Sequence, residues 1–319
     1  MSVDIVIVNF NTCDLLRECL ESVERARSEV ADLHVFVVDN ASADASVEMV
    51  RGNFPWVELI PLSENLGFGA GNNRGVEIGS GDYLLFLNSD AQLTPMALSL
   101  LVDFLEAHPE CVAVGPRLIY PDGTFQPSCR RFPTLLRYTW SLSGMGTRLQ
   151  SSFPHAQTWL SEEEHAVASR VDMVSGACFL MRRAYFQEVG GFDENLFLFE
   201  EEFDLFYALA RRGLHACYCP TANVIHGKGK SVQVNRMANF ARFHFFRSKY
   251  YVFRKHYGKV NARLSYCTDL GILGLSGFFQ RIRRKPAHAL TSFRLCRLAW
   301  PAAQLSGEQV RALDLKLPE

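Results

Sequence analysis

The chain begins with a regular alternation of short apolar runs and amphipathic segments, which constrains the fold more than any other feature. The apolar runs predict strands at residues 3–8, 33–38, 57–62 and 83–87, and the segments between them, at 15–26, 46–53 and 69–79, have the spacing of helices. Strands that alternate with helices form a mostly parallel sheet, because each helix returns the chain to the edge where the next strand starts. We therefore expect an α/β fold with helices on both faces of the sheet.

Polar side chains follow each of these four strands at the point where it ends. The segments read Asn9-Phe10-Asn11, Asp39-Asn40-Ala41-Ser42, Glu64-Asn65-Leu66-Gly67 and Asn88-Ser89-Asp90. Ligands of open α/β sheets bind beyond the carboxyl ends of the parallel strands, so the four segments together predict a binding site at one edge. Each segment taken alone fits an Asx turn or a helix cap equally well.

A second feature is the segment 197–206, where four carboxylates interrupt an apolar and aromatic stretch. We expect a helix over residues 200–213, and at about 100° per residue Glu202 falls on the same arc as Phe203 and Phe206. The other three acids fall outside this arc: Glu200, Glu201 and Asp204. A carboxylate held among apolar groups is costly unless its charge is used, which makes Glu202 a candidate active-site base. The alternative is a set of surface acids that complement the helix dipole.

Asp90 is a candidate metal ligand, because it directly follows an apolar strand. Mg²⁺ or Mn²⁺ in such a place takes one or two protein carboxylates together with phosphate oxygens. His226, in the glycine-rich and basic segment 224–231, could supply a second ligand, and Lys228 could neutralise phosphate. A helix cap at Asp90 and an ordinary loop histidine at 226 fit the sequence equally well.

The net charge of −1 conceals two opposite parts. Residues 1–227 carry 15 Lys and Arg against 30 Asp and Glu, whereas residues 228–299 carry 16 against 1. The basic part predicts contact with an anionic surface or ligand, while the acidic part argues against a nucleic-acid partner. Aromatic residues alternate with basic ones at 240–251, and an apolar segment follows at 270–279. This pattern fits a region lying on an anionic membrane, or helices that pack their aromatic side chains on the rest of the protein.

The cysteines and the N-terminus indicate where the protein works. Nine cysteines, an odd number without paired Cys-x-x-Cys spacing, predict free and mostly buried thiols in a reducing compartment. The first residues lack the pattern of a signal peptide, and no apolar run reaches the roughly 18 residues of a membrane-spanning helix. We therefore expect a cytoplasmic protein.

The order of the motifs resembles that of the family 2 glycosyltransferases, and especially their bacterial rhamnosyltransferase-like branch. The resemblance covers about residues 3–258 and is carried by Asn9-Phe10-Asn11, Asp39-Asn40-Ala41-Ser42-Ala43-Asp44, Asn65-Leu66-Gly67-Phe68-Gly69-Ala70-Gly71-Asn72-Asn73, Asn88-Ser89-Asp90, Gly190-Gly191-Phe192-Asp193, Glu201-Glu202-Phe203-Asp204 and the segment 226–231. It implies the GT-A fold of nucleotide-diphospho-sugar transferases.

The resemblance also implies roles for particular residues. Glu202 would be the catalytic base, with Glu201 as the reserve candidate, and Asp90 the metal ligand, completed by His226. The nucleotide-diphospho-sugar donor would be held by Asn9, Asn11, Asp39, Asn65, Gly67, Asn72, Asn88, Ser89, His226 and Lys228. Two positions depart from the common pattern: the Asp-x-Asp motif has Asn88 in its first place, and the base position holds Glu where Asp is commoner.

These observations favour one function and leave two alternative functions. We expect a GT-A catalytic domain at residues 1–232 and a basic, mainly helical extension at 233–319. Together they would form a metal-dependent, inverting transferase that moves L-rhamnose from dTDP-rhamnose to a glycan or lipid-linked acceptor in bacterial surface polysaccharide synthesis, with possible contact at the inner face of the membrane. A nucleotidyltransferase would need a glycine-rich basic loop where residues 9–13 read Asn-Phe-Asn-Thr-Cys. A non-catalytic nucleotide-sugar-binding module is the second rival.

Overall fold

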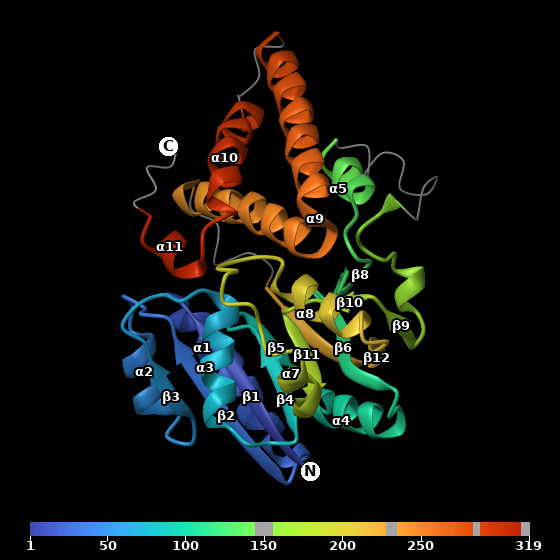
Figure 1. The fold of residues 1–319 in the computed structure, drawn as a ribbon. Coiled ribbons are helices and arrows are strands. Elements are labelled where there is room, and N and C mark those ends of the chain that lie inside the picture. Colours follow the sequence, from blue (N-terminus) through green and yellow to red (C-terminus); the bar gives the residue numbers. More distant parts are fainter. Residues whose placement is uncertain (144–155, 228–234, 283–287, 314–319) are drawn as a thin grey trace. The chain divides into compact units, whose positions relative to one another are not determined.

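The computed structural model describes residues 1–143, 156–227, 235–282 and 288–313 (Figure 1). The chain divides into two compact units, which are described separately. The sheet unit comprises residues 1–132, 159–193 and 201–231, and the helical unit comprises residues 133–158, 194–200 and 232–319. The helical unit thus takes in two segments from the middle of the chain in addition to the C-terminal region.

A large mixed sheet forms the centre of the sheet unit. Its main strands are β1 (Ser2–Asn9), β2 (Asp32–Asp39), β3 (Glu58–Pro61), β4 (Tyr83–Leu87), β5 (Ala91–Leu93), β6 (Cys111–Ile119), β11 (Cys178–Arg182) and β12 (His215–His226), in the order β3-β2-β1-β4-β11-β6-β12-β5. Two short strands, β7 (Phe125–Gln126) and β9 (Ser169–Val171), pair with β6 and β12, and β8 (Cys129–Arg130) pairs with β10 (Met173–Val174) in a separate small sheet.

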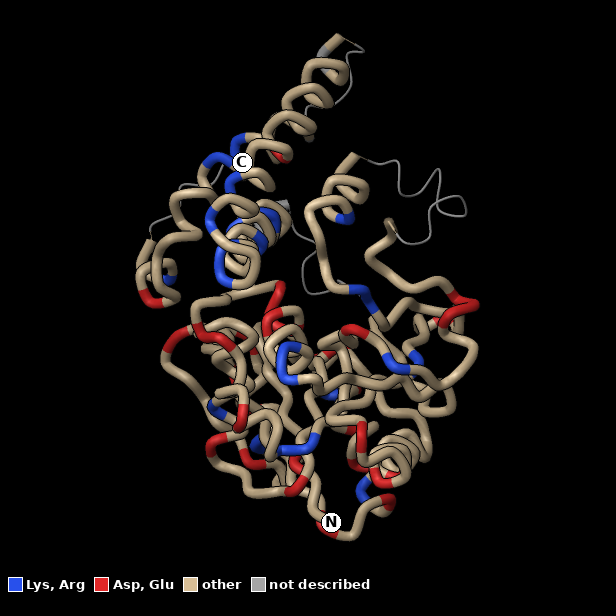
Figure 2. The backbone as a smooth tube through the Cα atoms, turned by 45° about the vertical axis from the view of Figure 1, so that its right-hand side comes forward, with Lys and Arg blue, Asp and Glu red and all other residues tan. Residues whose placement is uncertain are grey.

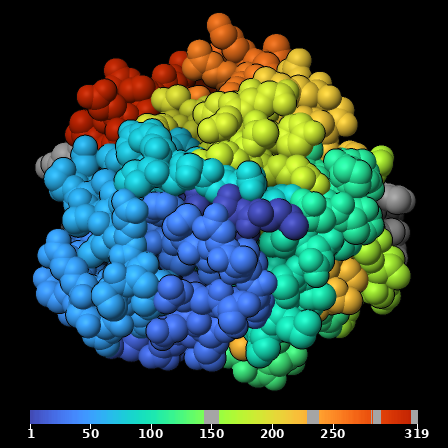
Figure 3. Space-filling view, turned by 90° about the horizontal axis from the view of Figure 1, so that it is seen from below, coloured from blue at the N-terminus to red at the C-terminus, as the bar shows by residue number. Residues whose placement is uncertain are grey.

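The strand directions bring distant segments to the same edge. Strands β1 to β4 pair in parallel, whereas β11 is antiparallel to both β4 and β6. Strand β6 therefore runs in the same direction as β4, and so does β12, which pairs in parallel with β6. The carboxyl ends of β1, β2, β4 and β12 consequently lie at one edge of the sheet. Figure 3 views the protein from the opposite side, where residues from the first half of the chain form most of the surface.

Helices cover both faces of the sheet, as the alternation predicted. Helices α1 (Cys13–Ala26), α2 (Ser46–Asn53) and α4 (Ala97–Ala107) join one face through a buried cluster that includes Ile5 and Ile7. Helices α3 (Phe68–Ile78), α7 (Arg183–Glu188) and α8 (Glu201–Ala210) cover the other, onto which the alternate residue Val6 projects. A Cβ at Gly75 of α3 would overlap the Val6 side chain, so glycine permits the close approach of α3 to β1.

The helical unit contains α5 (Leu135–Leu142), α9 (Asn235–Ile282), α10 (His288–Ala302) and α11 (Gly307–Arg311). Its core joins Phe243, Phe246 and Tyr250 of α9 to Leu295 and other residues of α10. Non-helical backbone at Gly258, with φ 85°, breaks α9 into two parts. These elements confirm the predicted C-terminal helical extension. None of the helices in the described part of the chain is both long and apolar enough to cross a membrane.

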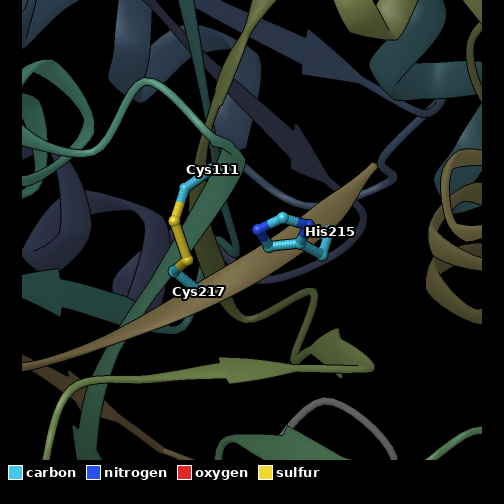
Figure 4. Close-up of side chains that lie close together, drawn as sticks. All are labelled: Cys111, His215 and Cys217. Atoms are coloured by element: carbon cyan, nitrogen blue, oxygen red, sulfur yellow. A yellow bond between two sulfur atoms is a disulfide. The ribbon is translucent and has the colours of Figure 1, made fainter. Parts of the chain in front are cut away.

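Two of the nine cysteines form a disulfide, so the prediction of free thiols throughout is wrong for this pair. Cys111 on β6 and Cys217 on β12 lie on neighbouring strands with their Cα atoms 5.9 Å apart, and His215 lies beside them (Figure 4). The pair is separated by 106 residues, so no local spacing reveals it. The other seven cysteines are free, and burial raises the pKa of the Cys19 and Cys178 thiols, which keeps them protonated.

The disulfide gives a simple expected count. Titration of the denatured protein with a thiol reagent should find seven thiols without reductant and nine after reduction. Because the bond closes a long loop, reduction should lower the free energy of unfolding by about 2–4 kcal/mol. Nine reactive thiols in protein purified without reductant would contradict the pairing, and Cys111→Ser should leave the thiol count of the reduced protein lower by one.

Candidate functional site

The segments with polar residues at their strand ends meet at one edge of the sheet. Asn9 and Asp39 are paired as the last residues of β1 and β2, and His226 is the last residue of β12. Cys178, the first residue of β11, pairs with Leu87 at the end of β4, so the loop at residues 175–177 lies at the same edge. The ends of β1, β2, β4 and β12 and the loop at residues 175–177 thus meet where ligands of such sheets bind.

Asn9 and Asp39 form a buried hydrogen-bonded pair. Asn9 Nδ2 donates to Asp39 Oδ2 at 2.9 Å and to Ser42 Oγ at 3.1 Å, and Ser42 N donates to Asp39 Oδ1 at 2.9 Å. Asn9 and Asp39 are 0% and 2% exposed. Both carboxylate oxygens of Asp39 therefore already accept hydrogen bonds, which fix the loop after β1 against the loop after β2.

The other predicted donor-binding residues of this region make local contacts. Asn11, exposed and in the left-handed conformation with φ 54°, accepts a hydrogen bond from Ala43 N at 2.7 Å. Asn65 Oδ1 accepts from Gly67 N at 2.9 Å, as in an Asx turn. Asn72 is buried in α3 and donates to Phe68 O at 3.0 Å. These contacts shape the loops, and of the three residues Asn11 is the one classed as exposed.

The end of β4 is tied to two neighbouring segments. Ser89 Oγ and Thr12 Oγ1 lie 2.9 Å apart, and Thr12 Oγ1 donates to Asn9 Oδ1 at 2.6 Å. Asn88 N donates to Ala177 O at 2.9 Å. The backbone on the N-terminal side of Asp90 is therefore held between the end of β1 and the loop before β11.

Asp90 and His226, far apart in the sequence, are brought together by the pairing of β12 with β5. His226 Nε2 lies 3.3 Å from Asp90 Oδ1, and the two side chains are 12% and 8% exposed. Gly227 N also donates to Asp90 O at 3.0 Å. If Asp90 were only a helix cap and His226 only a loop residue, the two side chains would not need to lie close together. Binding of one ligand by both residues does require it.

Gln126, which the sequence analysis missed, sets the orientation of His226. Its Oε1 lies 2.8 Å from His226 Nδ1. An amide oxygen only accepts hydrogen bonds, so Nδ1–H donates to it and Nε2 is turned toward Asp90. Gln126 belongs to the short strand β7, and no motif marks it in the sequence. Lys228, the remaining residue predicted here, lies outside the described part of the chain.

The Asp90–His226 pair fits a divalent cation bound together with phosphate. A carboxylate oxygen and an imidazole nitrogen are both types of group that bind metal ions, and Gln126 already fixes the orientation of the imidazole. Two protein ligands would leave the other coordination positions to diphosphate oxygens and water, as is usual for Mg²⁺ in nucleotide sites.

Glu202 stands in the first turn of α8 and faces the loop before β11. Its Oε1 accepts a hydrogen bond from Gly176 N at 2.9 Å, and the side chain is partly exposed. This contact places Glu202 beside the loop whose Ala177 O binds the backbone after β4. The carboxylate is therefore oriented by the backbone and still reachable by a ligand.

The prediction that the other three acids lie on the solvent side of the helix is wrong. Glu200, Glu201 and Asp204 are only 3%, 2% and 4% exposed. The helix starts at Glu201, after left-handed backbone at Phe199 and Glu200 with φ of 69° and 70°, so Glu200 precedes the helix. A helical wheel assumes a single covered face, so it misplaced these residues. Glu202 is the most exposed of the four acids.

Gly176 should be needed for the position of Glu202. A Cβ at this residue would overlap Glu202 Oε1, so Gly176→Ala should displace the carboxylate and break its hydrogen bond. If Glu202 is a catalytic base, the turnover rate should fall about 100-fold, the cost of moving such a group by about 1 Å, while ligand binding elsewhere at this edge should persist. Gly52→Ala is the matched control, since a Cβ there meets nothing within 4 Å. Equal turnover by the two variants would show that Gly176 does not position Glu202.

The fold and this edge define the class of the protein. The structure aligns with a mannosyltransferase from Pyrobaculum calidifontis in complex with GDP-Man and Mn²⁺, with a TM-score of 0.52, 16% identity and coverage of 95% of this chain and 74% of that one. It also aligns with GalNAc-T7 in complex with UDP, GalNAc and Mn²⁺, with a TM-score of 0.55, 15% identity and coverage of 79% and 50%. These likenesses give the fold as the GT-A type.

The family follows from the sequence. Residues 4–190 match the description "Glycosyl transferase family 2", and the chain belongs to this family. It is 31% identical to an N-acetylglucosaminyl-diphospho-decaprenol L-rhamnosyltransferase of Mycobacterium tuberculosis over 254 residues, which cover 75% of this chain and 80% of that protein. It is 28% identical to the O-antigen biosynthesis protein RfbC of Myxococcus xanthus, over 72% of this chain but 17% of that protein. The resemblance seen in the motifs is thereby confirmed.

Proposed function

We propose that this glycosyltransferase is metal-dependent and inverting, and that it uses a nucleotide-diphospho-sugar donor bound at the described edge of the sheet. The observation that carries the proposal is the 3.3 Å approach of His226 Nε2 to Asp90 Oδ1. A carboxylate and an imidazole side by side at the carboxyl ends of the strands suit a metal ion that also binds a diphosphate.

The proposed donor is dTDP-rhamnose and the proposed acceptor a glycan or lipid-linked sugar in bacterial surface polysaccharide synthesis. The support is the M. tuberculosis relative, whose name gives an L-rhamnosyl donor group and a lipid-linked acceptor, at 31% identity over most of both chains. The Myxococcus relative, named for O-antigen biosynthesis, supports the same class of product. A lipid-linked acceptor would place the enzyme in the cytoplasm, at the inner face of the membrane.

In the proposed reaction Glu202 removes the proton of the acceptor hydroxyl as its oxygen attacks the anomeric carbon from the side opposite the diphosphate. The Gly176 N–H bond holds one carboxylate oxygen, which orients the group for in-line attack. A bound Mn²⁺ or Mg²⁺ would stabilise the charge that develops on the leaving diphosphate. His226, oriented by Gln126, and Asp90 would hold that ion and the diphosphate, with Lys228 adding positive charge.

The nucleoside is assigned to the loops after β1, β2 and β3. Asn9 and Asp39 are enclosed in their own hydrogen bonds, so we assign them to shaping the pocket for base and ribose together with Gly67 and Asn72. Asn11 and Asn65, which keep exposure, and Ser89 and Asn88, beside Asp90, are assigned to direct contact with the donor.

A panel of donors tests this proposal. With Mn²⁺ present, calorimetric titration should show binding of dTDP and dTDP-rhamnose, and chelation of the metal should weaken it. UDP- and GDP-linked sugars should bind more weakly if the rhamnose assignment is right. A nucleotidyltransferase would instead take a nucleoside triphosphate and release pyrophosphate, and a non-catalytic module would bind the donor without releasing dTDP in the presence of acceptor.

A further inference from the structure

The second part of α9, after the break at Gly258, carries exposed apolar side chains on a face that no other element in the described part of the chain covers. Besides Phe279, which is 54% accessible, the exposed ones are Val260, Leu264, Leu275, Phe278 and Ile282, with 73%, 48%, 63%, 60% and 62% of their surface accessible. Their spacings place them on one side of the helix, because residues three or four apart lie above one another. We call these five residues the exposed stripe. The opposite side is buried at Ala262, Ser265, Asp269, Leu273 and Gly277.

Such a stripe is unusual for a helix in contact with water. The outer side of a surface helix is normally polar, whereas residues 260–282 present apolar groups along about 33 Å of helix at 1.5 Å per residue. Exposed apolar groups gathered on one side of a helix, as at Leu275, Phe278 and Ile282, mark a site of interaction.

The structure also separates the two alternatives left open by the sequence. In the segment 240–251, Phe243, Phe246 and Tyr250 are buried in the core of the helical unit, which is the packing alternative. The apolar side chains further along α9 behave differently, because Leu275, Phe278 and Ile282 remain exposed. The membrane alternative is therefore confined to the second part of the helix.

The exposed charges beside the stripe are positive. Asp269 is the one acid between residues 228 and 299, and it is buried, accepting hydrogen bonds from Lys249 Nζ at 2.7 and 2.9 Å. Exposed bases flank the stripe on α9 at Lys259 and Arg263 and stand on α10 at Arg294 and Arg297. Figure 2 shows Lys and Arg prevailing over Asp and Glu on the first part of α9 and near the break, whereas residues 264–280 carry no Lys or Arg. Within the described residues of 228–299, no exposed acid offsets these cations.

We propose that the exposed stripe and the bases beside it dock the protein on the surface of an anionic phospholipid membrane. A helix with an apolar face and basic flanks lies in the interfacial region, with its apolar side chains at the boundary between head groups and acyl chains. Lys259, Arg263 and the two α10 arginines would meet lipid phosphates. This docking rests on the proposed function in one respect. A lipid-linked acceptor presents its diphosphate at the membrane surface, so docking there would bring the enzyme to its acceptor.

Flotation of the full chain with vesicles tests this docking without donor or acceptor. The protein should float with vesicles containing phosphatidylglycerol at low salt, and binding should decrease as the salt concentration rises. The double variant Phe278→Ser with Ile282→Ser should lower the partition coefficient about tenfold or more, since two exposed apolar groups no longer enter the membrane. Lys259→Gln with Arg263→Gln should lower it roughly fivefold for each charge removed.

The controls keep the inference separate from the enzymatic proposal. Ile78→Ser and Val167→Ser remove exposed apolar groups, 49% and 63% accessible, from the sheet unit and should leave flotation unchanged. The stripe variant should transfer sugar to a water-soluble acceptor as fast as the wild-type protein does. If the wild-type protein itself transfers no sugar in this assay, the proposed function is contradicted, whereas the docking is not. Absence of flotation at low salt would overturn the docking. A second result would also overturn it: a wild-type dimer in solution that is absent in the stripe variant, with no binding to vesicles by either protein. The stripe would then be the contact with a second copy of the chain.

Discussion

Glu202→Gln should abolish nearly all sugar transfer while leaving donor binding intact. The amide keeps the size of the side chain but cannot accept the acceptor proton, and general base catalysis contributes about 10²–10⁴-fold. The turnover number should therefore fall by this factor, equivalent to about 3–5 kcal/mol of activation free energy. Steady-state transfer assays and calorimetric titration of dTDP with Mn²⁺, made on the same preparation, measure the two effects separately.

Glu201→Gln is the matched control for this prediction. Glu201 is adjacent in sequence but only 2% exposed, and its side chain lies near Gly69 at the start of α3. Its substitution should change thermal stability more than turnover. If Glu201→Gln removed transfer while the Glu202 variant kept it, with both proteins folded, the base would be Glu201.

Asp90→Asn should remove the dependence of donor binding on the metal. The substitution preserves shape but replaces the carboxylate near His226 Nε2 with a neutral amide, a poorer ligand for a hard cation. Binding of dTDP in the presence of Mn²⁺ should weaken about 10–100-fold, the scale found when metal sites are disturbed. Binding measured without metal should change little, and transfer should be lost.

Asp122→Asn provides the comparison, because Asp122 is an exposed carboxylate in the turn before β7. It should bind dTDP and Mn²⁺ like the wild-type protein. Unchanged metal dependence in Asp90→Asn would remove Asp90 from the metal site and, with it, the main support for the proposed function.

The sequence predicted the parts of the structure that depend on local pattern. The alternation of residues 3–87 predicted the order of the first strands and helices, and the polar strand ends lie at one edge because parallel strands require it. The approach of His226 to Asp90 could be stated only as a possibility, since it depends on β12 pairing with β5 across more than a hundred residues.

Contacts without a local signal were not predictable. Gln126 orients His226 from a two-residue strand, Cys111 bonds to Cys217 across two neighbouring strands, and the buried Asp4 pairs with Arg183 of α7. Each depends on which strands and helices become neighbours. The burial of Glu201 and its neighbours was mispredicted for a related reason, because a helical wheel assumes that only one side of a helix is buried.

Transfer of the sugar itself, observed with its stereochemistry, tests the central claim most directly. The purified protein would be incubated with dTDP-rhamnose, Mn²⁺ and an N-acetylglucosaminyl-diphospho-lipid, and the released dTDP and the anomeric configuration of the product would be measured. The account predicts one dTDP per sugar transferred and a product whose anomeric configuration is opposite to that of the donor. Retention of the donor configuration, or transfer unaffected by both metal chelation and Glu202→Gln, would contradict it.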